Sequence, residues 1–307
     1  MPSNSRRSFL QASGMAGIGA LAGCIGSITG GDGGPLTIGA PVPLSGPLDL
    51  LGQETRSGHK FGLDYVDNTI NDREVEVVVE DTETNPSVGL QKVKKLVEED
   101  QVDLLMGVSS SAVGLGIAPY LKNEVDVPFI ISQVWTTDAR ENSKYCNRDW
   151  FFSWASARQG GLANAKFIYN HLESHEEGSI DTTKAHFIGL DYAAGQSARD
   201  NFSRDFGNLG GSMTGETMVP PDETDYSVYM EDLSNADADV ITAFLPGPAG
   251  VQFMKQSHEY GLKDSKAVVG MVDTASPVST SAAGASANGI YNTDFYAAET
   301  ENELVTV

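Results

Sequence analysis

The chain has 307 residues, of which 40% are hydrophobic, and this is long enough to bury the cores of two domains of ordinary size. Its 42 acidic and 20 basic residues give a formal net charge of -22, spread along the chain, so no basic face for nucleic acid is evident. We therefore expect no nucleic-acid partner. The acidic surface is typical of a halophilic protein, the alternative being an acidic protein from ordinary salinity.

The amino-terminal segment, MPSNSRRSFLQASGMAGIGALAGC, has the pattern of an export signal. Arg6 and Arg7 precede a glycine- and alanine-rich apolar run that falls short of the about 20 strongly apolar residues needed to span a membrane. We interpret residues 1–23 as a twin-arginine signal peptide. The signal ends in LAGC, which resembles a lipobox and predicts lipid attachment at Cys24. The alternative is that Cys24 is an ordinary residue near a conventional cleavage site.

Residues 24–35 contain too much glycine to pack and are expected to form a flexible tether. Only Cys146 follows Cys24, so a disulfide between two cysteines of the folded part is excluded. The stability of that part must come from its hydrophobic core. The sequence does not assign a role to Cys146.

From Leu36 onward, short apolar runs alternate with helical patterns. The runs are rich in branched residues and end at glycine, proline or serine, which predicts buried strands at 36–42, 75–80, 102–108 and 127–132. Apolar residues at helical spacing predict helices between them, at 53–70, 86–99 and 112–125. Strands that alternate with helices in this way predict a doubly wound parallel sheet.

The pattern restarts near residue 157 as a second unit of the same kind. Strands are expected at 185–191, 212–219, 239–245 and 267–272, and helices at 158–174, 196–209, 226–235 and 249–261. The predicted fold class is therefore α/β, with two doubly wound parallel-sheet lobes joined by a hinge. We assign lobe 1 to residues 36–155 and lobe 2 to 156–290, with crossings near 154–158 and 274–290. Residues 291–307 are expected to begin a return toward lobe 1.

Ligands of open parallel sheets bind beyond the carboxyl ends of the strands, so the expected site is the cleft between the lobes. Ser109, Ser110 and Ser111 fall where the strand 102–108 ends and the helix 112–125 begins. Their hydroxyls and the first free amides of the helix should converge there and attract a carboxylate. The alternative is that one serine caps its own helix.

Several segments together resemble the solute-binding proteins of branched-chain amino acid transporters, which include leucine/isoleucine/valine-binding and amide-binding receptors. The resemblance runs from Leu36 to about Tyr296. It is carried by IGAPVPLSGPLDLLG (38–52), VEDTETNPSVGLQKVKKLVEED (79–100), GVSSSAVGLGIAP (107–119), VPFIISQVWTT (127–137), GLDYAAG (189–195) and GVQFMKQSHEYGL (250–262). It implies a two-lobed fold of the type I periplasmic-binding-protein kind.

The resemblance also implies roles for particular residues. The Ser110 hydroxyl, with main-chain groups of Val108 and Ser109, would hold the carboxylate of the ligand. The main chain of Val134, and the hydroxyl and main chain of Thr136, would hold its carboxylate and ammonium.

Some positions depart from the family pattern. Leu51 and Ala194 stand where the family usually has aromatic residues, and Phe244 follows a strand where it has a tyrosine. The acid that neutralises the ammonium aligns with Val272, although the adjacent Asp273 could reach the ligand. We therefore expect a remodelled pocket, and branched-chain specificity does not carry over.

Three aromatic residues have two interpretations each. Trp135 and Phe244 could rebuild the missing pocket wall by stacking on an apolar group of the ligand, or they could belong to the core. Tyr192, at the end of a strand of lobe 2, could close over the ligand, or it could pack against the hinge.

Enzyme activity is not expected, because the chain contains no GxSxG, HExxH or paired CxxC motif. His171 and His175 lie one helical turn apart, which suits a metal pair, but their polar surroundings favour a solvated surface. We expect no metal and no cofactor.

The sequence thus predicts an extracytoplasmic protein anchored to the outer face of the cell membrane by lipidated Cys24. It would capture a small amino acid or amide and deliver it to an ABC permease. The alternative is a ligand-sensing receptor of the same fold. The family continues beyond the elements found here, so we expect a truncated copy with part of the first sheet uncovered.

Overall fold

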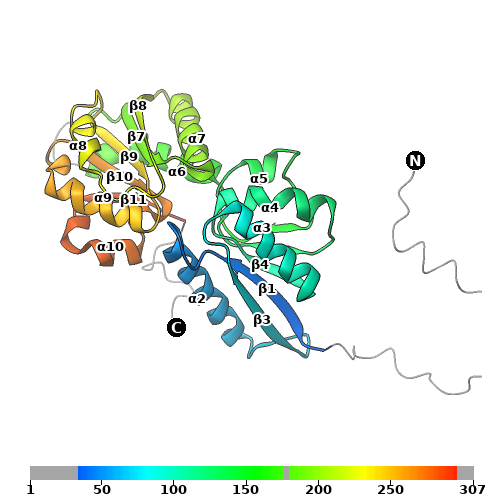
Figure 1. Ribbon diagram of the computed structural model, residues 1–307. Coiled ribbons are helices and arrows are strands. Elements are labelled where there is room, and N and C mark those ends of the chain that lie inside the picture. The colour runs from blue at the N-terminus through cyan, green and yellow to red at the C-terminus, as the bar shows by residue number, and fades with distance from the viewer. Residues whose placement is uncertain (1–33, 176–179, 296–307) are drawn as a thin grey trace, which may run out of the picture. The chain divides into compact units, whose positions relative to one another are not determined.

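The computed structural model describes residues 34–175 and 180–295. The described residues from Pro35 onward form one compact unit, and their strands build two separate sheets (Figure 1). The expected signal peptide, Cys24 and nearly all of the expected tether lie outside the described residues. Among the helices of the described ranges, none has the length and apolar character to cross a membrane.

The first sheet has the strand order β2-β3-β1-β4-β5-β6. Its strands pair in parallel except for β2 and β3, which form an antiparallel hairpin. The strands are β1 (Leu36–Val42), β2 (Thr69–Ile70), β3 (Arg73–Asp81), β4 (Leu104–Gly107), β5 (Phe129–Ile131) and β6 (Trp150–Phe152). The order places β1 at the centre, where the chain reverses its direction of winding.

The second sheet has the order β11-β10-β9-β7-β8 and is parallel throughout. Its central strands are fully buried because helices cover both faces, which explains their continuous apolar runs. The strands are β7 (Lys184–Leu190), β8 (Ser212–Val219), β9 (Val240–Phe244), β10 (Ala267–Met271) and β11 (Ile290–Thr293).

The α-helices connect the strands of each sheet (Figure 1). They are α2 (Asp49–Tyr65), α3 (Pro86–Lys94), α4 (Ser111–Asn123), α5 (Asp138–Glu141), α6 (Ala157–Asn170), α7 (Ala193–Leu209), α8 (Ser227–Ser234), α9 (Pro248–Glu259) and α10 (Pro277–Ala283). A π turn, Lys95–Glu99, extends α3, and short 3-10 segments lie at Leu172–His175, Leu262–Asp264, Val272–Ala275 and Gly284–Ala287.

The helix expected at 53–70 is shifted toward the amino terminus and ends at Tyr65. Asp67 and Asn68 have left-handed backbone with φ of 50° and 52°, which cannot continue a helix. Asn71 and Asp72, with φ of 51° and 61°, then form the two-residue turn of the β2–β3 hairpin. The run of Asp and Asn residues was the sequence signal for these turns.

The expected crossing near 274–290 is not present. These residues instead form α10, which packs on α9, and lead into β11, which adds to the second sheet. The described chain therefore remains with the second sheet until Thr293. The strands of the first sheet lie within residues 36–152 and those of the second within 184–293. The elements α5, β6, α10 and β11 were absent from the sequence prediction.

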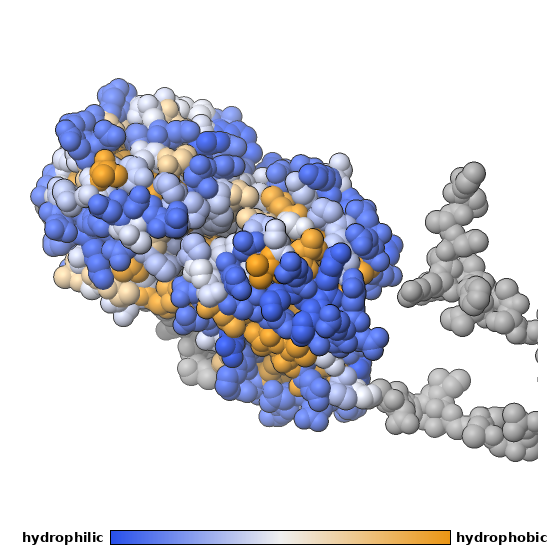
Figure 2. Space-filling view, in the orientation of Figure 1, coloured by the Kyte–Doolittle hydropathy of each residue, from blue (hydrophilic) through white to orange (hydrophobic). Residues whose placement is uncertain are grey.

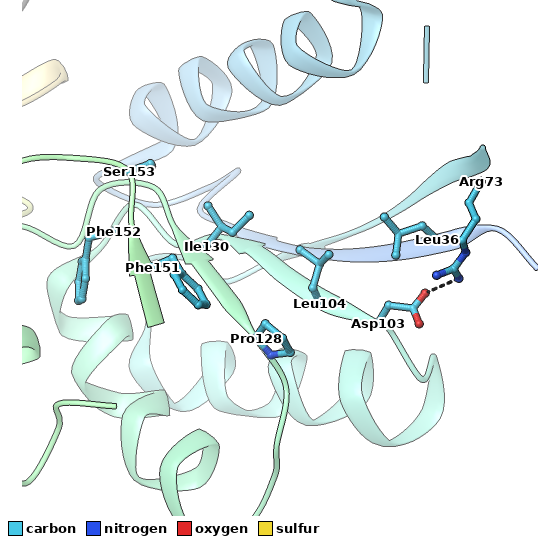
Figure 3. Close-up of a pocket in the computed structure, with 9 residues that line it drawn as sticks. All are labelled: Leu36, Arg73, Asp103, Leu104, Pro128, Ile130, Phe151, Phe152 and Ser153. Carbon is cyan, nitrogen blue, oxygen red and sulfur yellow. Dashed lines mark hydrogen bonds and ion pairs between the residues drawn. The ribbon is translucent and has the colours of Figure 1, made fainter. Parts of the chain in front are cut away.

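One face of the first sheet is open over β4, β5 and β6. The alternation along β5 shows this, because Phe129 and Ile131 are 0% and 1% exposed whereas Ile130 between them is 38% exposed. The buried face packs on α3 and α4. The open face carries a hollow of about 630 Å³, shown in Figure 3, with Leu104, Ile130 and Phe151 along it and the Arg73–Asp103 ion pair at one end. Figure 2 shows apolar side chains at the surface beside α2 on the same lobe.

Candidate functional site

A narrow cavity of about 20 Å³ receives side chains from both lobes. The first lobe contributes Leu51, Ser109, Ser111, Gln133, Trp135 and Trp154, and the second contributes Tyr192, Ala194, Phe244, Pro246 and Asp273. Six residues predicted from the sequence are among them, namely Ser109, Ser111, Trp135, Tyr192, Phe244 and Asp273. Most of the lining comes from loops at the carboxyl ends of strands, as expected for parallel sheets.

The backbone is strained where each lobe enters the cavity. Val108, directly before Ser109, has φ of 61°, and Val272, directly before Asp273, has φ of 52°. Left-handed backbone is costly for a β-branched residue. Hydrogen bonds hold the backbone in this conformation. The Val108 carbonyl accepts from the amide of Gln133, and the Val272 carbonyl accepts from the side chain of Asn292. Strain of this kind concentrates at functional sites, where it fixes the direction of a side chain.

The three serines have three different sets of contacts. Ser110 is the N-cap of α4 and its hydroxyl accepts from the amide of Val113, 3.4 Å away. Ser111 Oγ accepts from the amides of Trp135 and Thr136, at 2.9 and 3.1 Å. Ser109 Oγ lies 2.6 Å from Thr55 Oγ1. Ser110 therefore caps its helix and is not among the residues that line the cavity, and its predicted role in holding a carboxylate stays a prediction.

The hydroxyls of Ser109 and Ser111 retain the capacity to donate. Ser111 Oγ already accepts two amide hydrogens, so its own proton is free for an acceptor in the cavity. The Ser109–Thr55 pair needs only one of its two protons for the bond between them. The first amides of α4 lack acceptors within the helix and carry its positive dipole end. These donors suit a carboxylate.

Val134 and Thr136 are buried but do not line the cavity. The Val134 carbonyl accepts from the guanidinium of Arg140 at 3.1 Å, and Thr136 Oγ1 accepts from the amide of Asp138 at 3.3 Å. Both groups therefore have partners within their own lobe. Their predicted roles in ligand binding stay predictions.

Trp135 and Phe244 meet across the cleft. Their rings are stacked with centroids 5.7 Å apart and an interplanar angle of 13°. Trp135 comes from the first lobe but is buried among core residues of the second. A Cβ at position 160 would overlap its ring, so Gly160 on α6 is required for this approach. Trp135 therefore forms part of the cavity wall and also belongs to the core of the second lobe.

The cavity also has an acidic residue, Asp273, from the second lobe. Burial, followed by the charges of Asp294 and Glu54, raises the pKa of Asp273 to about 7. Burial likewise raises the pKa of Glu54 and of Asp294. Burial and the Asp273 charge raise the pKa of Tyr192, which lines the same cavity as that carboxyl. No ion pair joins Asp273, Asp294 or Glu54 to a cation among the described residues, so Asp273 suits a positively charged group.

The sequence did not indicate Gln133, Trp154 and Pro246 as cavity residues. Gln133 Oε1 is buried and has no hydrogen-bond partner, so it is an acceptor open to the ligand. Trp154 lies in the connection between the lobes, a position that only the folded chain brings to the cavity. Gln133 comes directly before Val134, at the end of a predicted strand, and this position was the one feature of the sequence that could have indicated it as a cavity residue.

Two α/β lobes that line one cleft from both sides define the class of two-lobed binding proteins. The chain belongs to the family described as Periplasmic binding protein, whose profile matches residues 35–306. This confirms the resemblance and the predicted α/β class with two parallel sheets. The family consists of binding proteins rather than enzymes, as expected.

Among curated proteins, the chain is similar to Leu/Ile/Val-binding protein homolog 6 of Brucella melitensis, with 26% identity over 231 residues. The similarity covers 74% of this chain and 55% of that protein. A protein with the same description from Brucella abortus has the same identity and coverage. The chain thus spans about half the length of these relatives.

Solved structures share the fold at low identity. A solute-binding protein of an ABC transporter from R. palustris, in complex with benzoate, has a TM-score of 0.79 and 19% identity over 89% of this chain and 72% of that chain. A second from R. palustris, in complex with 4-hydroxybenzoate, has a TM-score of 0.77 and 24% identity over 89% and 71%. A leucine binding protein from Thermotoga maritima has a TM-score of 0.73 and 19% identity over 87% and 72%.

Proposed function

We propose that this chain is the extracytoplasmic solute-binding protein of an ABC importer, which captures a small amino acid and delivers it to the membrane permease. One observation carries the proposal. A single cavity is lined by hydroxyl donors of the first lobe and by a buried carboxyl of the second lobe that has no cation partner among the described residues. Membership of the family and the names of the relatives support the same assignment.

The hydroxyl donors and the carboxyl of the cavity fit the two charges of an amino acid. The ligand carboxylate would accept from Ser111, from Ser109 and from the first amides of α4. The ligand ammonium would lie beside Asp273 and the Tyr192 hydroxyl, and would lower the pKa of Asp273 by supplying the missing positive charge.

The binding mechanism is a population shift. The carboxylate donors belong to the first lobe and the acid to the second, so a ligand contacts both sets only when the lobes are closed. Binding then favours the closed state by the difference in contacts between open and closed forms. A micromolar dissociation constant needs about 8 kcal/mol, which two charge-assisted ends and a buried side chain can supply together.

The test is a thermal-shift titration in concentrated KCl with L-leucine, L-phenylalanine and 4-hydroxybenzoate. An amino acid should raise the melting temperature of the wild type, and Ser111→Ala and Asp273→Asn should each reduce the apparent affinity by about tenfold or more. The exposed Asp222→Asn is the matched control and should leave the shift unchanged. Equal shifts in the wild type and both cavity variants would place the site elsewhere.

The anchoring of the protein is part of the same proposal. We expect export through the twin-arginine signal and a lipid on Cys24, which holds the binding protein beside its permease. Full-length protein made in its host should enter the detergent phase of Triton X-114, and Cys24→Ala should move it to the aqueous phase. Aqueous partition of the wild type would contradict the lipid.

A further inference from the structure

Trp135 belongs to the first lobe by its backbone and to the second lobe by its side chain. Ser111 Oγ, at the start of α4, accepts from the amides of Trp135 and Thr136 at 2.9 and 3.1 Å. The indole is 4% exposed and lies in a core cluster whose other buried members belong to the second lobe. This one residue therefore spans the boundary between the lobes.

The ring of Trp135 is used on both sides by the protein itself. It stacks on Phe244 with centroids 5.7 Å apart and an interplanar angle of 13°. The six-membered part of the indole lies directly against α6, because a Cβ added at Gly160 would come within 2.4 Å of its Cζ2 and Cη2 atoms. Glycine at position 160 is therefore required for the ring to enter the second lobe.

Hydrogen bonds fix the loop of Trp135 to the second lobe as well. The Trp135 carbonyl accepts from the amide of Ala157, the first residue of α6, at 2.8 Å. The Thr137 amide donates to Ser197 Oγ on α7 at 3.2 Å, and the two hydroxyl oxygens of this pair are also 3.2 Å apart. The stack and these bonds form one contact between the lobes, which we call the Trp135 contact.

The Trp135 contact leaves almost no space between the lobes. The cavity that Trp135, Phe244 and Asp273 help to line has a volume of about 20 Å³. This is room for about one water molecule. Even the smallest amino acid is several times larger than water, so this arrangement of the lobes excludes a solute.

The contact also contains an unsatisfied polar group. The indole nitrogen Nε1 of Trp135 is buried and has no hydrogen-bond partner among the described residues. A buried donor without an acceptor costs free energy, and water would satisfy this donor once the indole left the second lobe. This cost favours a contact that can open.

We propose that Trp135 makes an autoinhibitory contact: the indole occupies the cleft, holds the two lobes together and must leave Phe244 and Gly160 before a solute can enter. The inference rests on the function proposed above and adds a regulatory step to it. In the solute-bound closed state, the lobes would enclose the solute with the indole displaced.

The contact and the solute then compete for the cleft. The apparent dissociation constant becomes the intrinsic constant divided by the fraction of molecules in which the contact is open. Stacking of one ring pair changes such an equilibrium by about twofold to tenfold beyond the effect of apolar burial.

Gly160→Ala tests the contact without changing any residue that lines the cavity. The added Cβ should displace the indole and let the lobes separate. The radius of gyration, measured by small-angle X-ray scattering of the whole chain in concentrated KCl without solute, should rise by about 5% from the roughly 19 Å of a compact chain of this length. Gly207→Ala, on α7 of the same lobe, is the matched control, because its added Cβ would meet no atom within 4 Å.

An unchanged radius in a Gly160→Ala protein with the circular dichroism of the wild type would overturn the inference. Ser197→Ala decides the question if Gly160→Ala does not fold, since it removes the bonds to Thr137 and adds no atom. It should also raise the radius of gyration, and an unchanged radius there would count against the contact.

Calorimetric titration with L-leucine and L-phenylalanine tests the competition. An amino acid that binds the wild type should bind Gly160→Ala about threefold or more tightly, because the competing arrangement is less populated. Weaker binding by an opened Gly160→Ala protein would overturn the inference, since Trp135 would then support the solute-bound state. Absence of binding by both proteins would contradict the proposed function, whereas the scattering comparison would still decide whether Trp135 holds the lobes together.

Discussion

At the scale of single residues, three adjacent serines have separate structural roles. Ser110 caps α4, Ser111 accepts two amides of the next loop, and Ser109 pairs with Thr55 on α2. One serine would suffice for the cap. The other two connect α4 to neighbouring segments and still have protons to donate into the cavity, which explains why hydroxyls occupy all three positions.

The protonation of Asp273 predicts how stability depends on pH. Its pKa rises from an ordinary 3.8 to about 7 in the folded, ligand-free chain, so the folded state binds a proton that the unfolded state has released. This contribution to stability is complete below about pH 4 and is lost as pH rises toward about 7. Asp273→Asn removes the titration, so the variant should gain stability relative to the wild type across that interval.

The measurement is the melting temperature of both proteins from pH 4 to 8 in concentrated KCl, without ligand. Asp222→Asn is the control, since that exposed carboxyl should not change the slope relative to the wild type. A constant difference between wild type and Asp273→Asn at every pH would show that Asp273 titrates normally.

At the scale of elements, Arg140 on α5 joins two segments of the first lobe at the connection to the second. Its guanidinium donates to the carbonyls of Val134, Trp154 and Ala155, at 3.1, 2.8 and 3.3 Å. It also lies over the Phe152 ring, 3.8 Å from the centroid. Burial lowers the pKa of Arg140 to about 10. The planar guanidinium is suited to several carbonyls at once, whereas an ammonium is a single point charge.

Arg140→Lys should therefore destabilise the chain by about 2 kcal/mol, because at least one of the carbonyl contacts and the stacking on Phe152 are lost. Chemical denaturation in concentrated KCl measures the loss. Arg158→Lys, on α6, is the matched control, since Arg158 makes an exposed ion pair with Glu141 and its replacement should change stability by less than about 0.5 kcal/mol. Equal effects of the two substitutions would show that the carbonyl contacts contribute little.

At the scale of the whole molecule, the open face of the first sheet exposes apolar side chains to solvent. Phe151 is 57% exposed there and Ile130 is 38% exposed. Concentrated salt screens the charge of -22 that otherwise keeps copies apart, so apolar faces can associate.

Phe151→Ser should change the free energy of unfolding by less than about 1 kcal/mol and reduce self-association in concentrated KCl. Phe129→Ser is the contrasting control, because Phe129 points to the buried face and its loss should cost about 3 kcal/mol or more. Sedimentation velocity at several protein concentrations and denaturation curves give the two quantities. Association that is unchanged in Phe151→Ser would show that another surface is responsible.

The sequence by itself determined the α/β class and most of the helices and strands. Burial on both faces requires continuous apolar runs, and one such run fixed β1 to the residue. The cap Asn85 and the following Pro86 likewise fixed the start of α3. It also indicated six cavity residues, because the carboxyl ends of parallel strands share one edge of a sheet.

Only the tertiary structure decided how those residues are used. The roles of the three serines depend on which amides and hydroxyls come within about 3 Å, and those partners lie as far as 54 positions away in the chain. The insertion of Trp135 into the second lobe depends on Gly160 across the cleft, and the pKa of Asp273 depends on Glu54 and Asp294 from distant elements. Contacts between distant segments are absent from local patterns, since periodicity and spacing describe only neighbours along the chain.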